Sequence, residues 1–553
     1  MFTVNVASHL AMMATSSPDR VAVCAPHARG RKSLTFRELH EESDALAHGL
    51  GHLGIGAQSR VALMVPPTLE FFTLAFALFK LAAVPVMIDP GMGVKNVGTC
   101  LREAEPQAFV GIPKAHVARR LFGWAKRSLR TTVNVGAGRF YCHQSVRELI
   151  DEGKSAGPFA SPPVSPDDMA AILFTSGSTG IAKGAVYTHG IFSQQVEVLK
   201  STYGIQPGEI DLCTFPLFAL FGPALGMTCI IPDMNPARPA TIDAAKTIAT
   251  IEQFGVTNLF GSPAVIRRLG DYASRNPSKS LPTLRRVLSA GAPASAPVIE
   301  RFVNLLAPGV QLFTPYGATE SLPVANIGSD EILSETRHLT DAGHGICVGR
   351  PVAGMTVRII GIRDDAIAEW NDALCVPPGT IGEIVVRGPV VTKAYFRRED
   401  ATKLAKIIDP HTGEILHRMG DVGYFDTSGR LWFCGRKSHR VETPYGALFT
   451  DKIEPMFNSV EGVFRTALVG IKRHGTTYPA ICVDTPVRGW AWVQLEAALR
   501  ERALAIDPVN PIVAFLRYPG FPVDVRHNSK IFREKLAVWA SRKLGRTWKG
   551  TPV

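Results

Sequence analysis

The sequence contains few of the features that mark several common protein classes. Its nine cysteines are scattered along 553 residues and form no Cys-x-x-Cys pair, which argues against a zinc ribbon or a disulfide framework and favours a reducing compartment. Residues 1–19 have no Lys or Arg ahead of an apolar stretch, so they do not predict a secretory signal peptide. We therefore expect a cytoplasmic protein.

Uninterrupted apolar runs long enough to span a membrane are also absent. Residues 212–232 carry no charge and are long enough to span a bilayer, but Pro216, Gly222, Pro223 and Gly226 interrupt them. A buried segment or the wall of an apolar pocket is the better interpretation. With 46% hydrophobic and 20% charged residues, the composition is that of a globular chain.

Positive charge is in excess and is unevenly distributed. The chain has 60 Lys and Arg against 48 Asp and Glu, a net charge of +12, and residues 435–553 hold 19 of the former and 10 of the latter. Such a surplus fits nucleic acid, an acidic membrane surface or an anionic small molecule. The aromatic residues of this end are few and mostly in apolar context, so we do not expect a stacking surface for nucleic acid.

Short apolar runs alternate with helix-like segments through the first 330 residues. In the segment 34–55, which looks like a strand followed by a helix, Leu39, Leu46, Leu50 and Leu53 share one helical face. The other runs lie at 61–65, 84–88, 170–174, 258–260, 286–288 and 311–313. This alternation predicts α/β layers with largely parallel sheets.

The pattern of predicted strands and helices changes towards the C-terminus. Short β-rich runs at 357–360, 382–387 and 431–433 predict a small β-subdomain within about 340–435. Residues 436–553 mix strand-like and helix-like runs and predict a separate, smaller α+β lobe.

The segment 170–184, AAILFTSGSTGIAKG, carries the strongest chemical signal. An apolar strand runs into a loop with three glycines, which let backbone N–H groups approach an anion. Further donors are the hydroxyls of Thr175, Ser176, Ser178 and Thr179 and the ammonium of Lys183. The flanks of that lysine, Ala182 and Gly184, exclude a Walker A loop. We predict that the loop binds a triphosphate or pyrophosphate.

This loop resembles the signature of the acyl-adenylate-forming (ANL) superfamily, which includes acyl-CoA synthetases, peptide-synthetase adenylation domains and luciferases. Further family motifs follow in order: LTFREL at 34–39, SAGAP at 289–293, YGATES at 316–321, GE and RGP within 382–389, HRMGDVGYFD at 417–426, FCGR at 433–436 and NSK at 528–530. The resemblance spans about 34–536. It implies the ANL fold, with an adenylation body over 1–435 and a hinged, mobile lobe over 436–553.

The resemblance also implies ATP and Mg²⁺ as cofactors and gives roles to individual residues. Lys530, Glu320 and Thr175 would be catalytic, and Glu320 and Thr175 would hold the metal. Tyr316 would stack on the base, Asp421 would bind the ribose hydroxyls, and Arg436 would contact the ribose or a phosphate. The full nucleotide set is Thr175, Ser176, Gly177, Ser178, Thr179, Gly180, Lys183, Gly291, Ala292, Pro293, Tyr316, Gly317, Ala318, Thr319, Asp421, Arg436 and Lys530.

These residues also have structural interpretations. Glu320 could be a surface acid, Asp421 a turn former, and Arg436 the partner of a neighbouring acid. Lys530 could be one solvated charge among several. His189, just beyond the phosphate loop, either lines the acyl site or packs in the core.

The segment 216–223, PLFALFGP, resembles the acyl-site segment of the family, with Ala219 where a histidine is usual. We expect Phe218, Ala219, Phe221 and Gly222 to line an apolar substrate pocket that suits a long or branched alkyl acid. The alternative is ordinary core packing.

The root of the lobe departs from the thioester-forming members of the family. Ser438 stands where acyl-CoA synthetases usually have Asp, if the hinge lies at Lys437 or Ser438. In the following stretch Glu442 replaces a lysine and Tyr445 displaces a glycine. These changes argue against CoA as the acceptor.

The stretches PLFALFGPALGMT, IPDMNPARP and YGATESLPV resemble most closely the branch of the family that makes β-lactones in bacterial long-chain olefin biosynthesis. That resemblance implies a small-molecule substrate, a long-chain 2-alkyl-3-hydroxy fatty acid, activated as acyl-AMP and closed by its own 3-hydroxyl. It also implies association with other pathway enzymes and admits peripheral membrane contact, without nucleic acid. A long-chain acyl-CoA or acyl-AMP ligase with an external acceptor stays open as the alternative.

Overall fold

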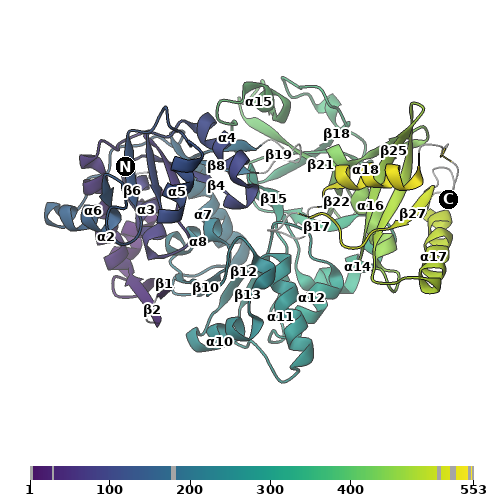
Figure 1. The fold of residues 1–553 in the computed structure, drawn as a ribbon, viewed down its shortest axis with the longest axis horizontal. Coiled ribbons are helices and arrows are strands. Elements are labelled where there is room, and N and C mark those ends of the chain that lie inside the picture. Colours follow the sequence, from purple (N-terminus) through teal and green to yellow (C-terminus); the bar gives the residue numbers. More distant parts are fainter. Residues whose placement is uncertain are drawn as a thin grey trace.

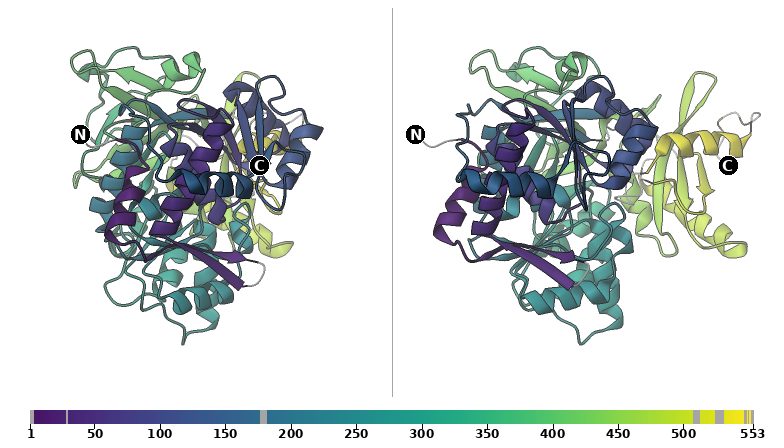
Figure 2. Two further views of the ribbon diagram at one scale, coloured as in Figure 1. Left: turned by 90° about the vertical axis from the view of Figure 1, so that its left-hand side faces the viewer. Right: turned by 60° about the vertical axis from the view of Figure 1, so that its left-hand side comes forward.

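The computed structural model describes residues 4–27, 30–175, 182–506, 512–523, 531–545, 548 and 550. Figure 1 shows three sheets in the larger part of the molecule, and a smaller group of strands and helices that ends with α18. In Figure 2 this smaller group projects to one side. The fold is α/β in layers, as the sequence predicts.

The first sheet has seven strands in the order β7-β6-β5-β3-β4-β8-β9, parallel except for the antiparallel pair β8–β9. Its strands are β3 (Arg60–Met64), β4 (Val84–Ile88), β5 (Ala108–Gly111), β6 (Thr131–Asn134), β7 (Gln144–Ser145), β8 (Met169–Thr175) and β9 (Lys183–Thr188). The accompanying helices are α2 (Phe36–His52), α3 (Leu69–Lys80), α4 (Val94–Ala104), α5 (Pro113–Leu121) and α6 (Val146–Gly153). The β8–β9 connection holds the phosphate loop.

The second sheet also has seven strands, in the order β14-β13-β12-β10-β11-β1-β2, and only β1–β2 is antiparallel. They are β1 (Val21–His27), β2 (Gly30–Thr35), β10 (Ile210–Cys213), β11 (Thr228–Ile230), β12 (Asn258–Gly261), β13 (Arg286–Ser289) and β14 (Leu312–Phe313). The accompanying helices are α1 (Ser8–Ser16), α7 (His189–Tyr203), α8 (Pro216–Ala219), α9 (Phe221–Ala224), α10 (Ala244–Phe254), α11 (Pro263–Arg275) and α12 (Ala296–Val303).

The third sheet is antiparallel, in the order β15-β16-β17-β22-β21-β19-β18, with β20 beside β21. Its strands are β15 (Tyr316–Ala318), β16 (Ser321–Asn326), β17 (Ile346–Pro351), β18 (Thr356–Ile360), β19 (Gly382–Arg387), β20 (Lys406–Ile408), β21 (Ile415–Phe425) and β22 (Leu431–Arg436). The nearby helices are α14 (Arg337–Asp341) and α15 (Glu399–Ala405).

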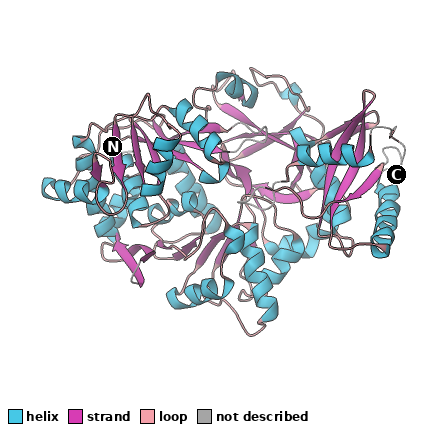
Figure 3. Ribbon diagram, viewed as in Figure 1, coloured by secondary structure: helices cyan, strands magenta, loops and turns pink. Residues whose placement is uncertain are grey.

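After β22 the chain forms a hairpin of β23 (Val441–Thr443) and β24 (Gly446–Leu448), then a three-stranded sheet of β25 (Arg465–Arg473), β26 (Thr476–Asp484) and β27 (Ala514–Arg517). Helices α16 (Thr450–Asn458), α17 (Trp490–Ile506) and α18 (Arg533–Leu544) complete this part. Figure 3 shows its mixture of helices and strands at the end of the molecule opposite the first sheet.

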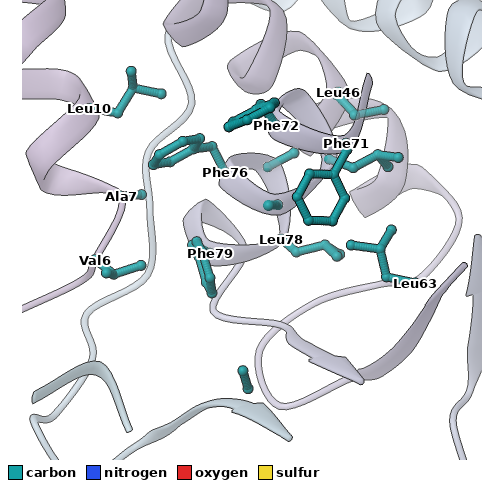
Figure 4. Packing of buried hydrophobic residues seen from close by; sticks show 14 of the residues in the cluster. Val6, Ala7, Leu10, Leu46, Leu63, Phe71, Phe72, Phe76, Leu78 and Phe79 are labelled. Atoms are coloured by element: carbon teal, nitrogen blue, oxygen red, sulfur yellow. The ribbon is translucent and has the colours of Figure 1, made fainter. Parts of the chain in front are cut away.

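Local sequence explains individual elements. Thr35 and Glu38 form a reciprocal capping box at the start of α2, which satisfies otherwise unpaired N–H groups. Helix α3 is apolar on every side and is buried from Phe71 to Lys80. Figure 4 shows its phenylalanines packed among side chains from α1 and α2. Lys80 is tolerated there because its Nζ lies 2.7 Å from Oδ1 of Asp44.

The predicted secondary structure is confirmed in its main features. Each predicted run of the first 330 residues contains a strand, and residues 212–232 form β10, two short helices and β11 rather than one long helix. Within the described part of the chain, no helix combines the length and the hydropathy that crossing a membrane requires. All nine cysteines are free thiols, and seven of them are buried.

Candidate functional site

A cleft of about 1980 Å³ lies where the three sheets and the residues after β22 meet. Its walls include the carboxyl ends of parallel strands, such as Met64 of β3, Ile88 of β4 and Ser289 of β13. In open α/β sheets, ligands characteristically bind outside the carboxyl ends of the strands. The cleft is therefore the candidate active site.

The structure brings most of the predicted nucleotide residues together in this cleft. They come from five separate motifs and from all three sheets of the body. Those that line it are Lys183, Gly291, Ala292, Pro293, Tyr316, Gly317, Ala318, Thr319, Glu320, Asp421 and Arg436.

At the end of the cleft near β9, where phosphate binding is predicted, Tyr395 contacts both a lysine and a carboxylate. Nζ of Lys183 lies 5.1 Å from the centre of the Tyr395 ring, and the Tyr395 hydroxyl donates a 2.7 Å hydrogen bond to Oε1 of Glu320. Pairing of the segment around Tyr395 with β9 produces this arrangement, since the Phe396 N–H donates to the Gly184 carbonyl at 2.8 Å. A cation and a carboxylate thus flank the space next to the phosphate loop, a donor set that suits phosphates and Mg²⁺.

A buried lysine supports this end from behind. Lys406 donates from Nζ to the carbonyl of Thr392 and, at 3.2 Å, to its Oγ1. The Thr392 N–H in turn donates to the Glu320 carbonyl at 2.8 Å. Burial lowers the pKa of Lys406 to about 7, although the Glu320 carboxylate opposes that shift.

At the other end, Asp421 of β21 and Arg436 of β22 are cross-strand partners. Nη1 of Arg436 lies 2.8 Å from Oδ1 of Asp421, and the Tyr316 hydroxyl donates to Oδ2 at 2.7 Å. Burial and the adjacent carboxylate raise the pKa of Tyr316 well above its ordinary value, so the phenol stays a donor. This trio offers a carboxylate and a guanidinium, groups that can bind hydroxyls and phosphate.

The segment between these ends depends on glycine. Gly291 has a φ of +99°, a conformation that favours glycine. At Gly317 a Cβ would lie 2.6 Å from the Ser321 carbonyl oxygen, so the tight β15–β16 turn excludes a side chain. Both glycines leave main chain exposed to the cleft, where a flat base could lie against Tyr316.

The predicted acyl segment contributes an aromatic wall. The rings of Phe218 and Phe260 are stacked, with centres 4.0 Å apart, and Phe221 lies 6.0 Å from Phe218 and from Phe192. All four line the cleft. The wall is apolar, as the sequence predicts.

Three predicted substrate residues lie elsewhere, and for them the prediction needs correction. Ala219 and Gly222 face the core rather than the cleft: the Cys229 thiol donates to the Ala219 carbonyl at 3.5 Å, and a Cβ on Gly222 would lie 2.1 Å from Sγ of Cys229. His189 is fully buried at the start of α7, and its Nδ1 accepts from the Val6 N–H at 3.4 Å. Burial lowers its pKa to about 4. Because the side chain is buried and does not line the cleft, it packs in the core.

Several predicted residues cannot be placed. Ser176, Gly177, Ser178, Thr179 and Gly180 lie outside the described residues, as does Lys530. Thr175 ends β8, but its side chain is not described. The described residues on the C-terminal side of Lys530, Ile531 and Arg533, line the cleft.

Cations that follow β21 contribute to the cleft mainly in ion pairs. Nη2 of Arg533 lies 2.6 Å from Glu454, Nζ of Lys437 lies 3.1 Å from Glu383, and Arg436 pairs with Asp421. The positive surplus of this region is therefore largely compensated where it meets the cleft in the described structure.

Tyr395 and Lys406 are the site residues that sequence reasoning missed. Neither belongs to a recognised motif, and a single tyrosine or lysine carries no spacing signal. Only the tertiary structure brings these two residues close to Glu320.

Three comparisons with known proteins agree with this site. The family model described as AMP-binding enzyme matches residues 10–396. Among solved structures, the amide bond synthetase McbA from Marinactinospora thermotolerans has a TM-score of 0.78 at 21% identity and covers 97% of this chain and 99% of its own. ATP-bound MatB from Rhodopseudomonas palustris has a TM-score of 0.77 at 19% identity, with 98% and 100% covered. These structures share the fold.

Two curated relatives are much closer in sequence. The olefin beta-lactone synthetase of Stenotrophomonas maltophilia (strain K279a) is 48% identical over 552 residues, 98% of each chain. The protein of the same name from Xanthomonas campestris pv. campestris is 49% identical over 551 residues, again 98% of each. The predicted motif residues and an apolar wall meet in one cleft, and by its match to the family model and to these two relatives this chain belongs to the AMP-binding enzyme family, the acyl-adenylate-forming enzymes.

Proposed function

We propose that this protein activates a long-chain 2-alkyl-3-hydroxy fatty acid with ATP and closes it to a β-lactone. The observation that carries the proposal is the 48–49% identity, over nearly the whole of both chains, to two proteins named olefin beta-lactone synthetase. The cleft supports it, because it combines an anion-binding end with an extended apolar wall.

In the first step a carboxylate oxygen of the acid attacks the α-phosphorus of ATP, and pyrophosphate leaves with the electrons of the broken P–O bond. We assign Lys183 to the phosphates, Glu320 and Thr175 to Mg²⁺, and Lys530 to the charge that gathers in the transition state. Mg²⁺, when bound, neutralises phosphate charge. Tyr395 orients Glu320, while Tyr316, Asp421 and Arg436 hold the nucleoside.

In the second step the 3-hydroxyl oxygen attacks the acyl carbon of the adenylate. A C–O bond forms within the substrate, the bond to the AMP oxygen breaks, AMP leaves with that electron pair, and the hydroxyl proton passes to solvent. The nucleophile and the carbonyl belong to one molecule, so the step needs orientation rather than a second binding site.

The alternative is a long-chain ligase that passes the acyl group to CoA or another external acceptor. The segment after the proposed hinge gives it little support. Glu442, which stands at the usual lysine position, is paired with Arg440, and Tyr445 at the tip of the β23–β24 turn is exposed. We propose that residues 436–553 move about Lys437–Ser438 as one lobe between the two steps.

The decisive experiment is mass spectrometry of the products from a synthetic 2-alkyl-3-hydroxy acid, ATP and Mg²⁺, with and without CoA. We expect the β-lactone and AMP in both reactions. The matched control is the same acid without its 3-hydroxyl, which should stop at the acyl-adenylate. A product that forms only with CoA would overturn lactone synthesis in favour of the ligase.

A cytoplasmic enzyme with so apolar a substrate would gain from peripheral membrane contact, and α5 offers a suitable face. Residues 106–147 contain eight Lys and Arg and no Asp or Glu. Val117, Leu121, Phe122 and Tyr141 are 51–80% exposed on or near this helix, and the Arg120 guanidinium lies 5.2 Å from the Tyr141 ring centre. Basic and apolar side chains together suit an anionic lipid surface.

Flotation with phosphatidylglycerol vesicles tests this contact. The double variant Leu121→Asp, Phe122→Asp should lose binding, whereas Leu504→Asp, an equally exposed leucine on α17, should keep it. If the wild type fails to float, or if both variants bind equally, the α5 face is not a membrane surface. Association with other enzymes of the pathway rests on the names of the two relatives, and co-purification with those enzymes would test it.

A further inference from the structure

The cleft has two separate apolar walls. The first, the second-sheet arm, consists of Phe215, Phe218, Phe221 and Phe260, which belong to the packed cluster around α8, α9 and β12. The other, the first-sheet arm, belongs to a different packed cluster between the first sheet and helices α4 and α5. Its cleft-lining members are Met64, Ile88, Met92, Val97, Ala115, Ala118, Trp124 and Phe174.

The first-sheet arm starts at the phosphate end of the site. Ala182 and Phe396, the neighbours of Lys183 and Tyr395 in the chain, pack against its cluster. The chain segments that would surround the reacting phosphate therefore also border this wall. An apolar group attached close to the reacting carboxylate could enter it directly.

The second-sheet arm reaches the same centre from another side. The Tyr187 hydroxyl donates to the carbonyl of Thr319, the residue before Glu320. The Tyr187 ring lies 4.8 Å from that of Phe192, which lies 6.0 Å from Phe221. A continuous series of aromatic contacts thus leads from the carboxylate-binding region to the aromatic wall.

A straight-chain acid needs one such arm, whereas a 2-alkyl-3-hydroxy acid has hydrocarbon chains on two adjacent carbons next to its carboxylate. We infer that the two arms bind these two chains separately, one chain in each, so that the first-sheet arm is a second alkyl subsite. This inference rests on the proposed function and deepens it, because it makes the branch itself a recognised feature of the substrate. Holding both chains also restricts rotation about the bond between C2 and C3, which orients the 3-hydroxyl towards the carbonyl.

Small residues make room in the first-sheet arm. Ala115 and Ala118, one turn apart on α5, present only methyl groups to the cleft. Across the arm, Trp124 packs against α4 where Gly98 has no side chain, since a Cβ there would lie 3.1 Å from Nε1 of Trp124. A larger residue on the inner face of α5 would fill the space.

The test is Ala118→Phe, with Ala249→Phe on the exposed side of α10 as the matched control. Two substrate series are needed: one varies the 2-alkyl chain at a short, fixed C3 chain, and the other varies the C3 chain at a short, fixed 2-alkyl group. Pyrophosphate release gives kcat/KM for each acid. In the wild type, each additional buried methylene should raise kcat/KM about fourfold.

We expect Ala118→Phe to lower kcat/KM at least about tenfold for the long members of one series only. For the short members of that series, and for the whole of the other series, kcat/KM should change less than about twofold. Phe218→Ala should weaken the dependence on the other chain. Equal losses across both series, or no loss in either, would overturn the two-arm assignment. Unchanged circular dichroism and melting temperature would exclude misfolding as the cause.

This readout separates the inference from the proposed function. Pyrophosphate release reports adenylation alone, so the chain-length dependence is measurable even if no lactone forms. If the wild type makes lactone but the variants show no series-specific loss of kcat/KM, only the second subsite is refuted. If the variants show that loss but the wild type makes no lactone, only lactone synthesis is refuted.

Discussion

The Tyr395 hydroxyl and the Glu320 carboxylate are joined by a 2.7 Å hydrogen bond, although 75 residues separate them in the chain. Tyr395 also carries Lys183 against its ring. One side chain therefore contacts both charges that would face the phosphates. Its own pKa is raised by burial and by Glu320, so it remains a hydrogen-bond donor throughout the working pH range.

We expect Tyr395→Phe to raise the Mg²⁺ concentration needed for half-maximal ATP–pyrophosphate exchange about tenfold, because a hydrogen bond to a charged group contributes roughly 1.5–3 kcal/mol. Tyr424→Phe is the control. The Tyr424 hydroxyl donates a 3.0 Å hydrogen bond to the His344 carbonyl, and neither residue lines the cleft. If the two variants gave identical Mg²⁺ titrations, Tyr395 would have no part in orienting Glu320.

Glu320→Gln should have a larger effect on the same titration than Tyr395→Phe. The amide keeps the shape of the side chain but lacks the negative charge that Mg²⁺ prefers. An unchanged metal requirement would show that Glu320 is not a ligand.

Lys530→Ala should reduce ATP–pyrophosphate exchange about 100- to 1000-fold, the effect of removing one well-placed donor from a developing charge. The fold should persist, as measured by circular dichroism. Lys535→Ala is the matched control, because Nζ of Lys535 lies 4.5 Å from the Phe532 ring centre and has no part in the proposed reaction. Near-normal exchange in the Lys530 variant would contradict its assignment.

Arg436→Met should raise the KM for ATP and lower the melting temperature, because it leaves the buried Asp421 carboxylate without its cation. The loss of stability should be less than the roughly 3–5 kcal/mol seen for fully buried pairs, since the Arg436 side chain is 40% exposed. Adding Asp421→Asn should restore stability but not ATP affinity. If the two substitutions act additively on melting temperature, the pair is not coupled.

Lys406 should make stability depend on pH. Its pKa is lowered from 10.5 to about 7 in the fold, so between these values the unfolded chain holds a proton that the native protein lacks. The free energy of unfolding should therefore rise with pH over this window, by up to about 1.4 kcal/mol per unit. Lys406→Met should flatten that rise in urea titrations at pH 7–10. Parallel curves for wild type and variant would contradict the lowered pKa.

The sequence predicts the layers, and it identifies motif residues that the structure gathers in one cleft, because both depend on local pattern. Apolar runs such as 84–88 and 258–260 coincide with β4 and β12, and the glycine-containing motifs at 289–293 and 316–321 contribute residues to the cleft wall. Pattern fails where packing decides. Ala219 and Gly222 are predicted in the pocket wall, but the chain turns them towards Cys229. Of the four residues predicted in this segment, Phe218 and Phe221 line the cleft.

His189 shows the same limit from another side. A histidine close to a predicted phosphate loop suggests a role in substrate binding. In the structure, however, its Nδ1 accepts a hydrogen bond from the N–H of Val6, 183 residues away in the chain. Tyr395 and Lys406 are the opposite case, since residues without a motif acquire a role through strand pairing. Contacts between distant segments are not encoded in spacing.

Arg436 is both the last residue of β22 and the immediate predecessor of the turn at Lys437–His439, which leads into the C-terminal strands and helices. The guanidinium that we propose for the nucleoside and the proposed hinge are thus consecutive in the chain. Substitutions at this junction will be pleiotropic, altering nucleotide affinity and turnover together. Kinetics of variants there must be resolved into both parameters before either is interpreted as a change in movement.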